Sequence, residues 1–393
     1  MSFTQTPDGH KNGKGSYHQI GLVRGQFGGV PEAKWIKFIA DAGFDGWEEA
    51  SWELDLRRCD TDAGAAAFAA ERVALAKSHG LEIFTVATHL QGQVLGDEPS
   101  AKTLNFCSGK GQAKLAYKAW RQGGNTPPRT DPYFVPPEVA KLVQFEALRD
   151  LQACVRYAGH LSKLQNRKVA LPGFVGSPAN CWSHWFLFPP LPSNIEGFDI
   201  PDVREVSLEL LVERFTPVWN LCKEYGVTFD LECHPSERAM GDLESATDYI
   251  TYLGKQGFDH TVVGFNLDGS HMEWQNVSVI QFIREFPQYI HCAHVKGVQV
   301  EREHCRGGRL GGHRSMGHWT NGWKFVTAGT QRDANSLEEI FIELNRVGFD
   351  GAVSIEWEDN DADQFAGARS ALGNCRRADL PPSGLKHDEA LKG

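Results

Sequence analysis

The chain has 393 residues, of which 41% are hydrophobic and 23% charged, and its formal net charge is −10. This composition is ordinary for a globular protein, and the acidic balance argues against nucleic-acid binding, which usually requires a basic face. No stretch approaches the roughly 20 apolar residues that a membrane-spanning helix needs. The polar, Gly-rich residues 1–15 lack the apolar segment of a secretory signal. We therefore expect a cytoplasmic protein with a flexible lead-in and no membrane partner.

Strand-like and helix-like segments alternate along the chain, a pattern typical of a parallel sheet covered by helices. In chain order, strands are expected at residues 19–23, 47–49, 81–88, 168–175, 227–232, 261–267, 289–295 and 352–357. Helices are expected at residues 31–42, 63–79, 138–161, 206–225, 243–256, 279–286 and 336–347. Eight strands with helices between them predict an α/β chain folded as a (β/α)8 barrel. We expect one domain over residues 1–393, with the barrel at about 18–360 and a tail at 361–393.

Three long segments interrupt this alternation, at residues 90–137, 178–201 and 297–322. The first has no clear periodicity, the second is aromatic, and the third is rich in Gly, Arg and His. Loops of this length are usually functional or mobile, and we expect them at the C-terminal rim of the barrel. Several aromatic residues could form the wall of a pocket that stacks on a sugar ring or an aglycone. Alternatively, they pack against the barrel or form an oligomer interface. These residues are Trp182, Trp185, Phe186, Phe188 and Trp274.

Acidic residues and a histidine end four successive predicted strands, the places where barrel enzymes carry their active-site groups. They are Glu232, Asp268, His294 and Glu356. Crowded carboxylates repel one another unless a cation lies between them. Oxygen ligands with one imidazole suit manganese, magnesium, cobalt or zinc, and we expect one divalent ion, with manganese preferred. The structural alternative is that such residues are helix N-caps or ion-pair partners, as any one acid at a strand end often is.

Further polar residues end other strands and are candidates for binding hydroxyls or transferring protons. They are His89, His234 and Lys296, of which His89 is the preferred additional acid or base. Each also suits an ordinary rim or core position. The sequence has no GxGxxG motif and no P-loop, so a nucleotide cofactor is not expected.

The strand-end motifs together resemble those of the xylose-isomerase-like TIM barrels. These motifs are Leu-Glu at Glu232, Leu-Asp-x-x-His from Leu267 to His271, His-x-Lys from His294 to Lys296, and the Gly-Phe-Asp-Gly turn before Ile355-Glu356. The resemblance covers about residues 19–358 and is best from residue 227 onward. It implies a TIM barrel, and it implies that Glu232, Asp268, His294 and Glu356 are metal ligands. By the same resemblance Glu232 and Glu356 act as acid and base, His271 contacts a substrate hydroxyl, and Glu48 is a polar site residue.

The chain departs from this family's pattern at three points. Aldose isomerases that shift a hydride carry Lys where this chain has His234, so a two-metal hydride shift is not expected. The DNA-repair endonucleases of this fold need three zinc ions and more His and Asp ligands than are found here. Gly297 replaces the Asp that many members carry after His-x-Lys, and it opens the third insertion.

A single metal beside two carboxylates suits proton transfer next to a carbonyl group, through an enediolate. We therefore expect a sugar isomerase or epimerase, with a small-molecule sugar or glycoside as its substrate. A lyase that cleaves 3-oxo-glycosides or dehydrates an inosose by β-elimination is the alternative reaction. A non-catalytic sugar-binding or scaffold subunit is the alternative of another class. We expect a homo-oligomer, and a different partner subunit is the alternative.

Overall fold

The computed structural model describes residues 16–108, 111–185, 188–238, 241–301, 305–310 and 314–382. The expected lead-in at residues 1–15 and the end of the tail lie outside these residues. The chain divides into two compact units, the first formed by Met1–Trp47 and Asp268–Gly393 and the second by Glu48–Leu267. No helix among the described residues is both long and apolar enough to cross a membrane. Each unit is described by itself below, and the expected single domain stays a prediction.

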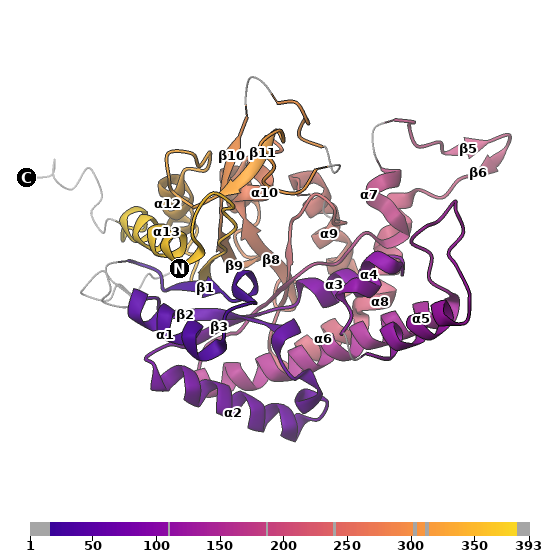
Figure 1. The fold of residues 1–393 in the computed structure, drawn as a ribbon. Coiled ribbons are helices and arrows are strands. Elements are labelled where there is room, and N and C mark those ends of the chain that lie inside the picture. The colour runs from indigo at the N-terminus through magenta and orange to yellow at the C-terminus, as the bar shows by residue number, and fades with distance from the viewer. Residues whose placement is uncertain are drawn as a thin grey trace, which may run out of the picture. The chain divides into compact units, whose positions relative to one another are not determined.

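The first unit contains three parallel strands in the order β1-β12-β9 (Figure 1). Its strands are β1 (Ile20–Val23), β9 (Ile290–Val295), β10 (Gly297–Val300), β11 (Trp323–Val326) and β12 (Ala352–Ile355). Its α-helices are α1 (Glu32–Ala42), α10 (Gly269–Glu273), α11 (Val279–Glu285), α12 (Leu337–Arg346) and α13 (Gln364–Ala378). A 3-10 turn, η1 (Gly25–Phe27), follows β1. The parallel strands are fully or almost fully buried, as expected when helices cover a parallel sheet.

The second unit contains the parallel neighbours β4, β7 and β8, and β3 joins β4 through a bridge between Thr85 and Ala170. Its strands are β2 (Gly46–Ala50), β3 (Glu82–Ala87), β4 (Leu171–Gly173), β5 (Asn194–Ile195), β6 (Phe198–Asp199), β7 (Phe229–Glu232) and β8 (Val263–Asp268). The chain passes between the units within β2 and at the end of β8.

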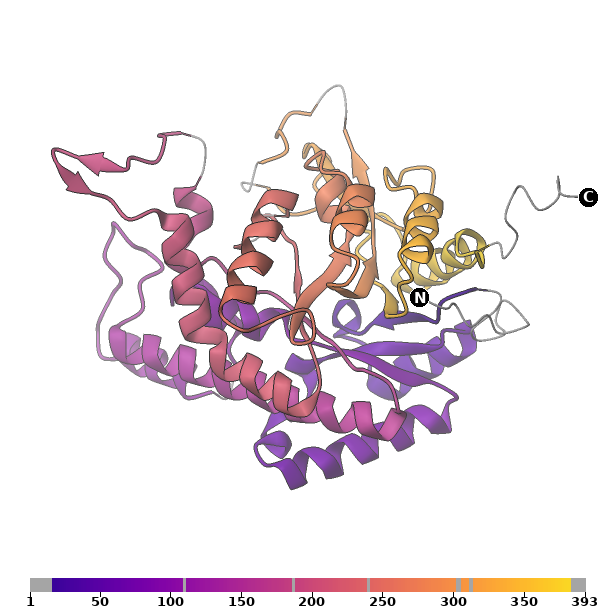
Figure 2. The same ribbon diagram turned by 180° about the vertical axis from the view of Figure 1, so that it is seen from behind.

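The described residues of the second unit form both long and short α-helices. They are α2 (Asp62–Ser78), α3 (His89–Gly96), α4 (Ala101–Phe106), α5 (Gln112–Gln122), α6 (Pro137–Gln165), α7 (Cys181–His184), α8 (Val203–Tyr225) and α9 (Leu243–Lys255), with 3-10 turns η2 (Ser51–Glu53), η3 (Leu56–Cys59) and η4 (Pro178–Asn180). The long helix α6 packs against both α2 and α8, and Figures 1 and 2 show it running along them.

The first insertion is more regular than the sequence suggested. Residues 90–137 were expected to be irregular, but α3, α4 and α5 lie in or at the edge of this segment. Helix α5 is made of good helix formers such as Gln, Ala, Lys and Leu. The expectation of an irregular segment was therefore wrong, because short helices separated by Gly and Pro do not produce a long periodic pattern.

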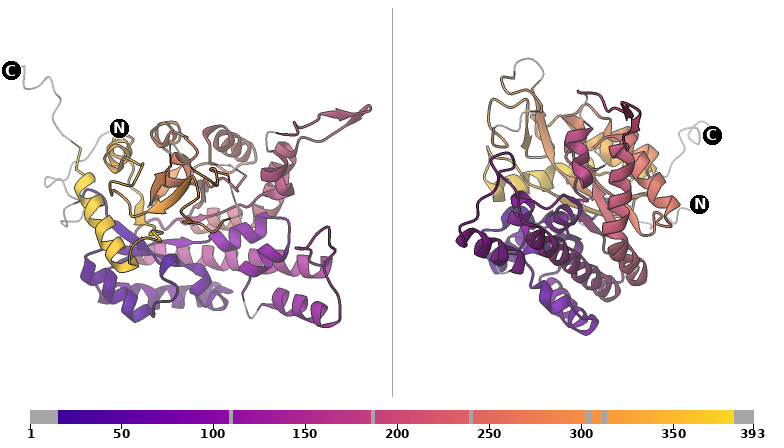
Figure 3. Two further views of the ribbon diagram at one scale, coloured as in Figure 1. Left: turned by 45° about the horizontal axis from the view of Figure 1, so that its top comes forward. Right: turned by 90° about the vertical axis from the view of Figure 1, so that its right-hand side faces the viewer.

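The other two insertions also contain regular structure. The third begins with β10, which pairs antiparallel with β11, the strand that directly follows the insertion, with Gly297 opposite Val326. In the second, β5 and β6 form a short two-stranded ribbon that extends beyond α7 (Figure 3). The aromatic residues Phe188 and Phe198 are 83% and 75% exposed, and Phe186 lies outside the described residues.

Candidate metal and substrate site

Asp268 is the last residue of β8 and also the N-cap of the short helix α10. Its Oδ1 accepts a hydrogen bond from the Ser270 amide at 2.8 Å, so the capping role considered from the sequence is present. Its Oδ2 lies 3.0 Å from the ammonium nitrogen of Lys296. Capping therefore uses one carboxylate oxygen of Asp268, and the other faces Lys296.

His294 and Glu356 are brought together by the pairing of β9 with β12. His294 lies opposite Ser354 in the parallel register, and Glu356 follows β12 directly. The Nδ1 atom of His294 is 3.2 Å from Oε2 of Glu356. One ligand atom from each of Asp268, His294 and Glu356 lies within 4.8 Å of the other two. The first unit thus gathers three of the four residues that the sequence singled out as metal ligands.

Lys296 is buried among these acidic groups. Its Nζ lies 2.8 Å from Glu356 Oε2, 3.2 Å from His271 Nε2 and 3.4 Å from Glu358 Oε2. The ammonium also lies 4.4 Å from the ring centroid of Phe325, which belongs to β11. The antiparallel pair of β10 and β11 therefore supplies an aromatic wall for this charge.

Sequence reasoning missed two polar neighbours of Glu356. Gln26, in the turn after β1, donates from Nε2 to Glu356 Oε1 at 2.7 Å and lies 3.4 Å from Glu358 Oε1. Burial raises the pKa of Glu358, while the nearby Lys296 ammonium opposes that rise. Gln26 lies three residues after the end of β1, and Glu358 lies three residues after the end of β12. Their approach to Glu356 depends on how the strands are arranged, which the local sequence does not reveal.

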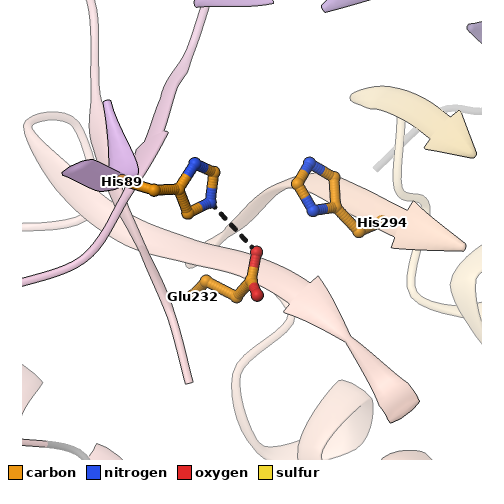
Figure 4. A group of neighbouring side chains, drawn as sticks. All are labelled: His89, Glu232 and His294. Atoms are coloured by element: carbon orange, nitrogen blue, oxygen red, sulfur yellow. Dashed lines mark hydrogen bonds and ion pairs between the residues drawn. The ribbon is translucent and has the colours of Figure 1, made fainter. Parts of the chain in front are cut away.

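Glu232, the fourth expected ligand, lies in the second unit at the end of β7 and is 2% exposed. Its Oε2 is 3.1 Å from Nε2 of His89 (Figure 4). The same oxygen accepts a hydrogen bond from Asn266 Nδ2 at 2.9 Å. Asn266 was not predicted, although it lies on β8 two residues before Asp268, and alternate residues of a strand share one face. Glu232 is thus a buried carboxylate held by an imidazole and an amide.

The position of His89 depends on how closely α3 approaches the loop after β4. His89 is the first residue of α3, and its ring contacts the ring of Phe174 edge-on, with centroids 4.8 Å apart. Cβ atoms added at Gly92 and Gly96 would lie 1.8 and 1.5 Å from the carbonyl oxygens of Phe174 and Val175. Only glycine allows this approach, which brings the start of α3 over Glu232.

A second buried carboxylate fastens the same loop. Glu237 accepts hydrogen bonds from the backbone amides of Val175, at 2.8 Å, and Gly176. Burial raises the pKa of Glu237 well above its ordinary value, and the neighbouring Asp97 adds to the rise. Glu237 therefore ties the segment after β7 to the loop after β4, which carries Phe174.

The remaining predicted site residues have well-defined surroundings. His234 Nδ1 is 2.8 Å from the Ser236 hydroxyl. Glu48 is buried and accepts a hydrogen bond from Thr85 at 2.6 Å. Trp274 stacks on Trp323 with centroids 4.7 Å apart and lies in an apolar cluster of the first unit. Whether these three residues contact substrate stays a prediction.

Residues 144–378, more than half of the chain, match the sequence profile described as xylose isomerase-like TIM barrel. The chain belongs to this family. The family and the TIM-barrel fold expected from the sequence are therefore both confirmed.

Solved structures of similar fold have low sequence identity to this xylose isomerase-like chain. The 3-keto-D-glucoside 4-epimerase YcjR of E. coli matches with a TM-score of 0.53 and 13% identity, covering 92% of this chain and 99% of its own. A D-psicose 3-epimerase of Clostridium cellulolyticum matches with 0.50 and 17%, covering 92% and 99%. The probable 3-DHS dehydratase AsbF of Bacillus anthracis matches with 0.51 and 13%, covering 91% and 99%. At these identities the likeness is one of fold.

Among curated proteins, the uncharacterized protein YfiH of Bacillus subtilis is 32% identical over 112 residues. The match covers 28% of this chain and 36% of YfiH. The chain thus spans about a third of the length of this relative.

Proposed function

We propose that the protein is a divalent-metal-dependent sugar isomerase or epimerase in which Glu232, Asp268, His294 and Glu356 hold one ion. The observation that carries the proposal is the buried cluster of Asp268, His294 and Glu356 in the first unit. The family's barrel supports the addition of Glu232, because the C-terminal ends of all its strands meet at one face. Glu232 ends a strand of the second unit, as Asp268 ends the next strand along the chain.

The residues fit a divalent ion by donor type and by spacing. Two ligand atoms of an ion bound at about 2.1 Å lie roughly 3 Å apart when adjacent and roughly 4 Å apart when opposite. The donor atoms of the three residues in the first unit lie within 4.8 Å of one another. Carboxylates with one imidazole suit manganese, with magnesium, cobalt and zinc as alternatives. When bound, such an ion polarises a substrate carbonyl and stabilises an enediolate.

Glu232 and Glu356 are the proposed acid and base for proton transfer beside the carbonyl. Each has one carboxylate oxygen near a second polar group, Glu232 at His89 and Glu356 at Lys296. These partners orient the carboxylates, and His89 offers an additional place to hold a proton. His271, Lys296, His234, Glu48 and Trp274 are proposed to contact the substrate.

A β-eliminating lyase is the second candidate reaction. The similarity to AsbF, which is named a probable dehydratase, supports it. YcjR is named an epimerase, but its 3-keto-D-glucoside substrate is the type of compound that such a lyase would cleave. After deprotonation beside a 3-oxo group, loss of the group at C1 would break a glycosidic bond, whereas loss of water would dehydrate an inosose.

The experiment is proton NMR in D2O with manganese-loaded protein and a panel of ketoses, aldoses, inososes and 3-oxo-glycosides. Deuterium entering beside the carbonyl, with the glycosidic bond intact, supports isomerase or epimerase activity. Release of an aglycone or of water from a 3-oxo substrate supports the lyase. Glu232→Gln and Glu356→Gln should abolish exchange, whereas Glu339→Gln, on the exposed side of α12, should not. Bound metal without any exchange would favour the non-catalytic sugar-binding or scaffold subunit.

A further inference from the structure

The buried ammonium of Lys296 lies where a metal ion's positive charge would also be favourable. Its nitrogen is 2.8 Å from Glu356 Oε2 and 3.0 Å from Asp268 Oδ2, and its side chain is 3% exposed. A charge this deeply buried is stable only when it is paired and hydrogen-bonded. Here the pairing partners are carboxylates of the proposed metal ligands.

The number of acidic groups exceeds what one lysine neutralises. Glu358 Oε2 lies 3.4 Å from the same nitrogen, so three carboxylates surround one ammonium. An ammonium has three N–H donors, and His271 Nε2, at 3.2 Å, competes for one of them. Among the described residues, three carboxyl groups thus share one lysine ammonium, and this acidic surrounding favours a further cation.

We propose that Lys296 is the built-in counter-cation of this site. Without a divalent ion it neutralises and orients Asp268 and Glu356. With the ion bound, its charge opposes the ion's and weakens the affinity. This inference rests on the proposed function, because it requires that the cluster binds a metal. It differs from a lysine that only contacts substrate, because such a residue would not change the metal affinity.

The geometry supports competition for the same oxygens. Glu356 Oε2 is shared between Lys296, at 2.8 Å, and His294 Nδ1, at 3.2 Å. The second oxygen of Glu356 is already bound by Gln26, and the second oxygen of Asp268 caps α10. A metal ion that binds Asp268 Oδ2 and Glu356 Oε2 must therefore share these oxygens with Lys296 or displace it.

The test compares wild-type protein with Lys296→Met and Lys296→Gln after complete removal of metal by a chelator. Manganese affinity is measured by isothermal titration calorimetry, and the melting temperature of the metal-free protein by circular dichroism. The matched control is Lys324→Met, which removes another lysine of the same unit, one that is paired with Asp361 at 2.5 Å. Both readouts are independent of catalytic activity.

We expect both Lys296 variants to bind manganese at least about tenfold more tightly, because a like charge within a few ångströms is removed. We also expect their metal-free forms to melt at lower temperature, because the carboxylates lose their counter-charge. Lys324→Met should change neither quantity. Equal or weaker manganese binding by the Lys296 variants, or unchanged melting of their metal-free forms, would overturn the counter-cation role. If wild-type protein binds no manganese, the proposed function itself fails. If it binds manganese but the Lys296 variants bind it no more tightly, only the counter-cation role fails.

Discussion

The ion pair between Arg72 and Glu49 provides a quantitative test of what stabilises the second unit. Arg72, on α2, donates from Nε at 2.9 Å and from Nη2 at 3.1 Å to the two oxygens of Glu49, on β2. Tyr157, on α6, also donates to Glu49 at 3.2 Å. The side chains of Arg72 and Glu49 are 11% and 3% exposed. The pair therefore links a strand to two covering helices.

Replacing Arg72 by Met leaves the Glu49 carboxylate buried without its counter-charge. Breaking such a pair by removing one partner costs about 3–5 kcal/mol. For a unit of this size we expect the melting temperature to fall by roughly 6–20 °C. Adding Glu49→Gln removes the orphaned charge and keeps an acceptor for Tyr157, so the double variant should be more stable than Arg72→Met alone.

The assay is urea or thermal unfolding followed by circular dichroism, with Arg58→Met as the control. Arg58 also belongs to a bidentate pair, with Glu71, but that pair is exposed to solvent, and exposed pairs contribute little. A loss below about 1 kcal/mol for Arg72→Met would refute the reasoning. So would a double variant no more stable than the single one.

Three further predictions follow from other features. Gly92→Ala should destabilise the protein by about 1–3 kcal/mol and lower turnover, because the added Cβ meets the Phe174 carbonyl oxygen at 1.8 Å; the helical control Gly254→Ala, with open space around it, should not. Burial raises the pKa of Asp333 to about 6, so the folded state holds this proton to higher pH than the unfolded state does. Stability should therefore fall as pH rises from about 4 to 6, by up to roughly 3 kcal/mol, and Asp333→Asn should flatten that slope in unfolding titrations. Chelation should lower the melting temperature of metal-loaded wild type, because a metal ion stabilises the folded state only while it is bound. It should leave the melting temperature of Glu356→Gln almost unchanged, because this variant lacks a proposed ligand.

The sequence predicted the barrel strands, and therefore which residues end them, because both follow local rules, while the roles of those residues stay predictions. Parallel strands read as short apolar runs, and residues at their ends are fixed by where those runs stop. Asp268, His294 and Glu356 therefore lie together in the first unit as an alternating strand–helix pattern predicts. The link between these residues and Glu232 stays a prediction from the barrel fold.

The features that sequence reasoning missed depend on contacts between distant segments. Gln26 contacts Glu356 across 330 positions of sequence, and no local pattern marks it. The helical character of α3 depends on its close packing against Phe174, about 80 residues further along the chain. Such contacts are set by packing, and intrinsic helix propensity is too weak a signal to reveal them.

The main-chain contact between α3 and the loop after β4 has a consequence for how this protein can vary. Where two segments meet through side chains, substitutions that change the size of those side chains also change the distance between the two backbones. At Gly92 and Gly96 no side chain intervenes, so the spacing is set by the van der Waals radii of backbone atoms. The distance from the start of α3 to the loop is thus independent of the residues around it. Designed libraries can therefore vary the exposed residues of the second insertion while His89 keeps its position, provided that Gly92 and Gly96 are left unchanged. The buried α3 residues Val94 and Leu95 must be kept as well, because they belong to the core.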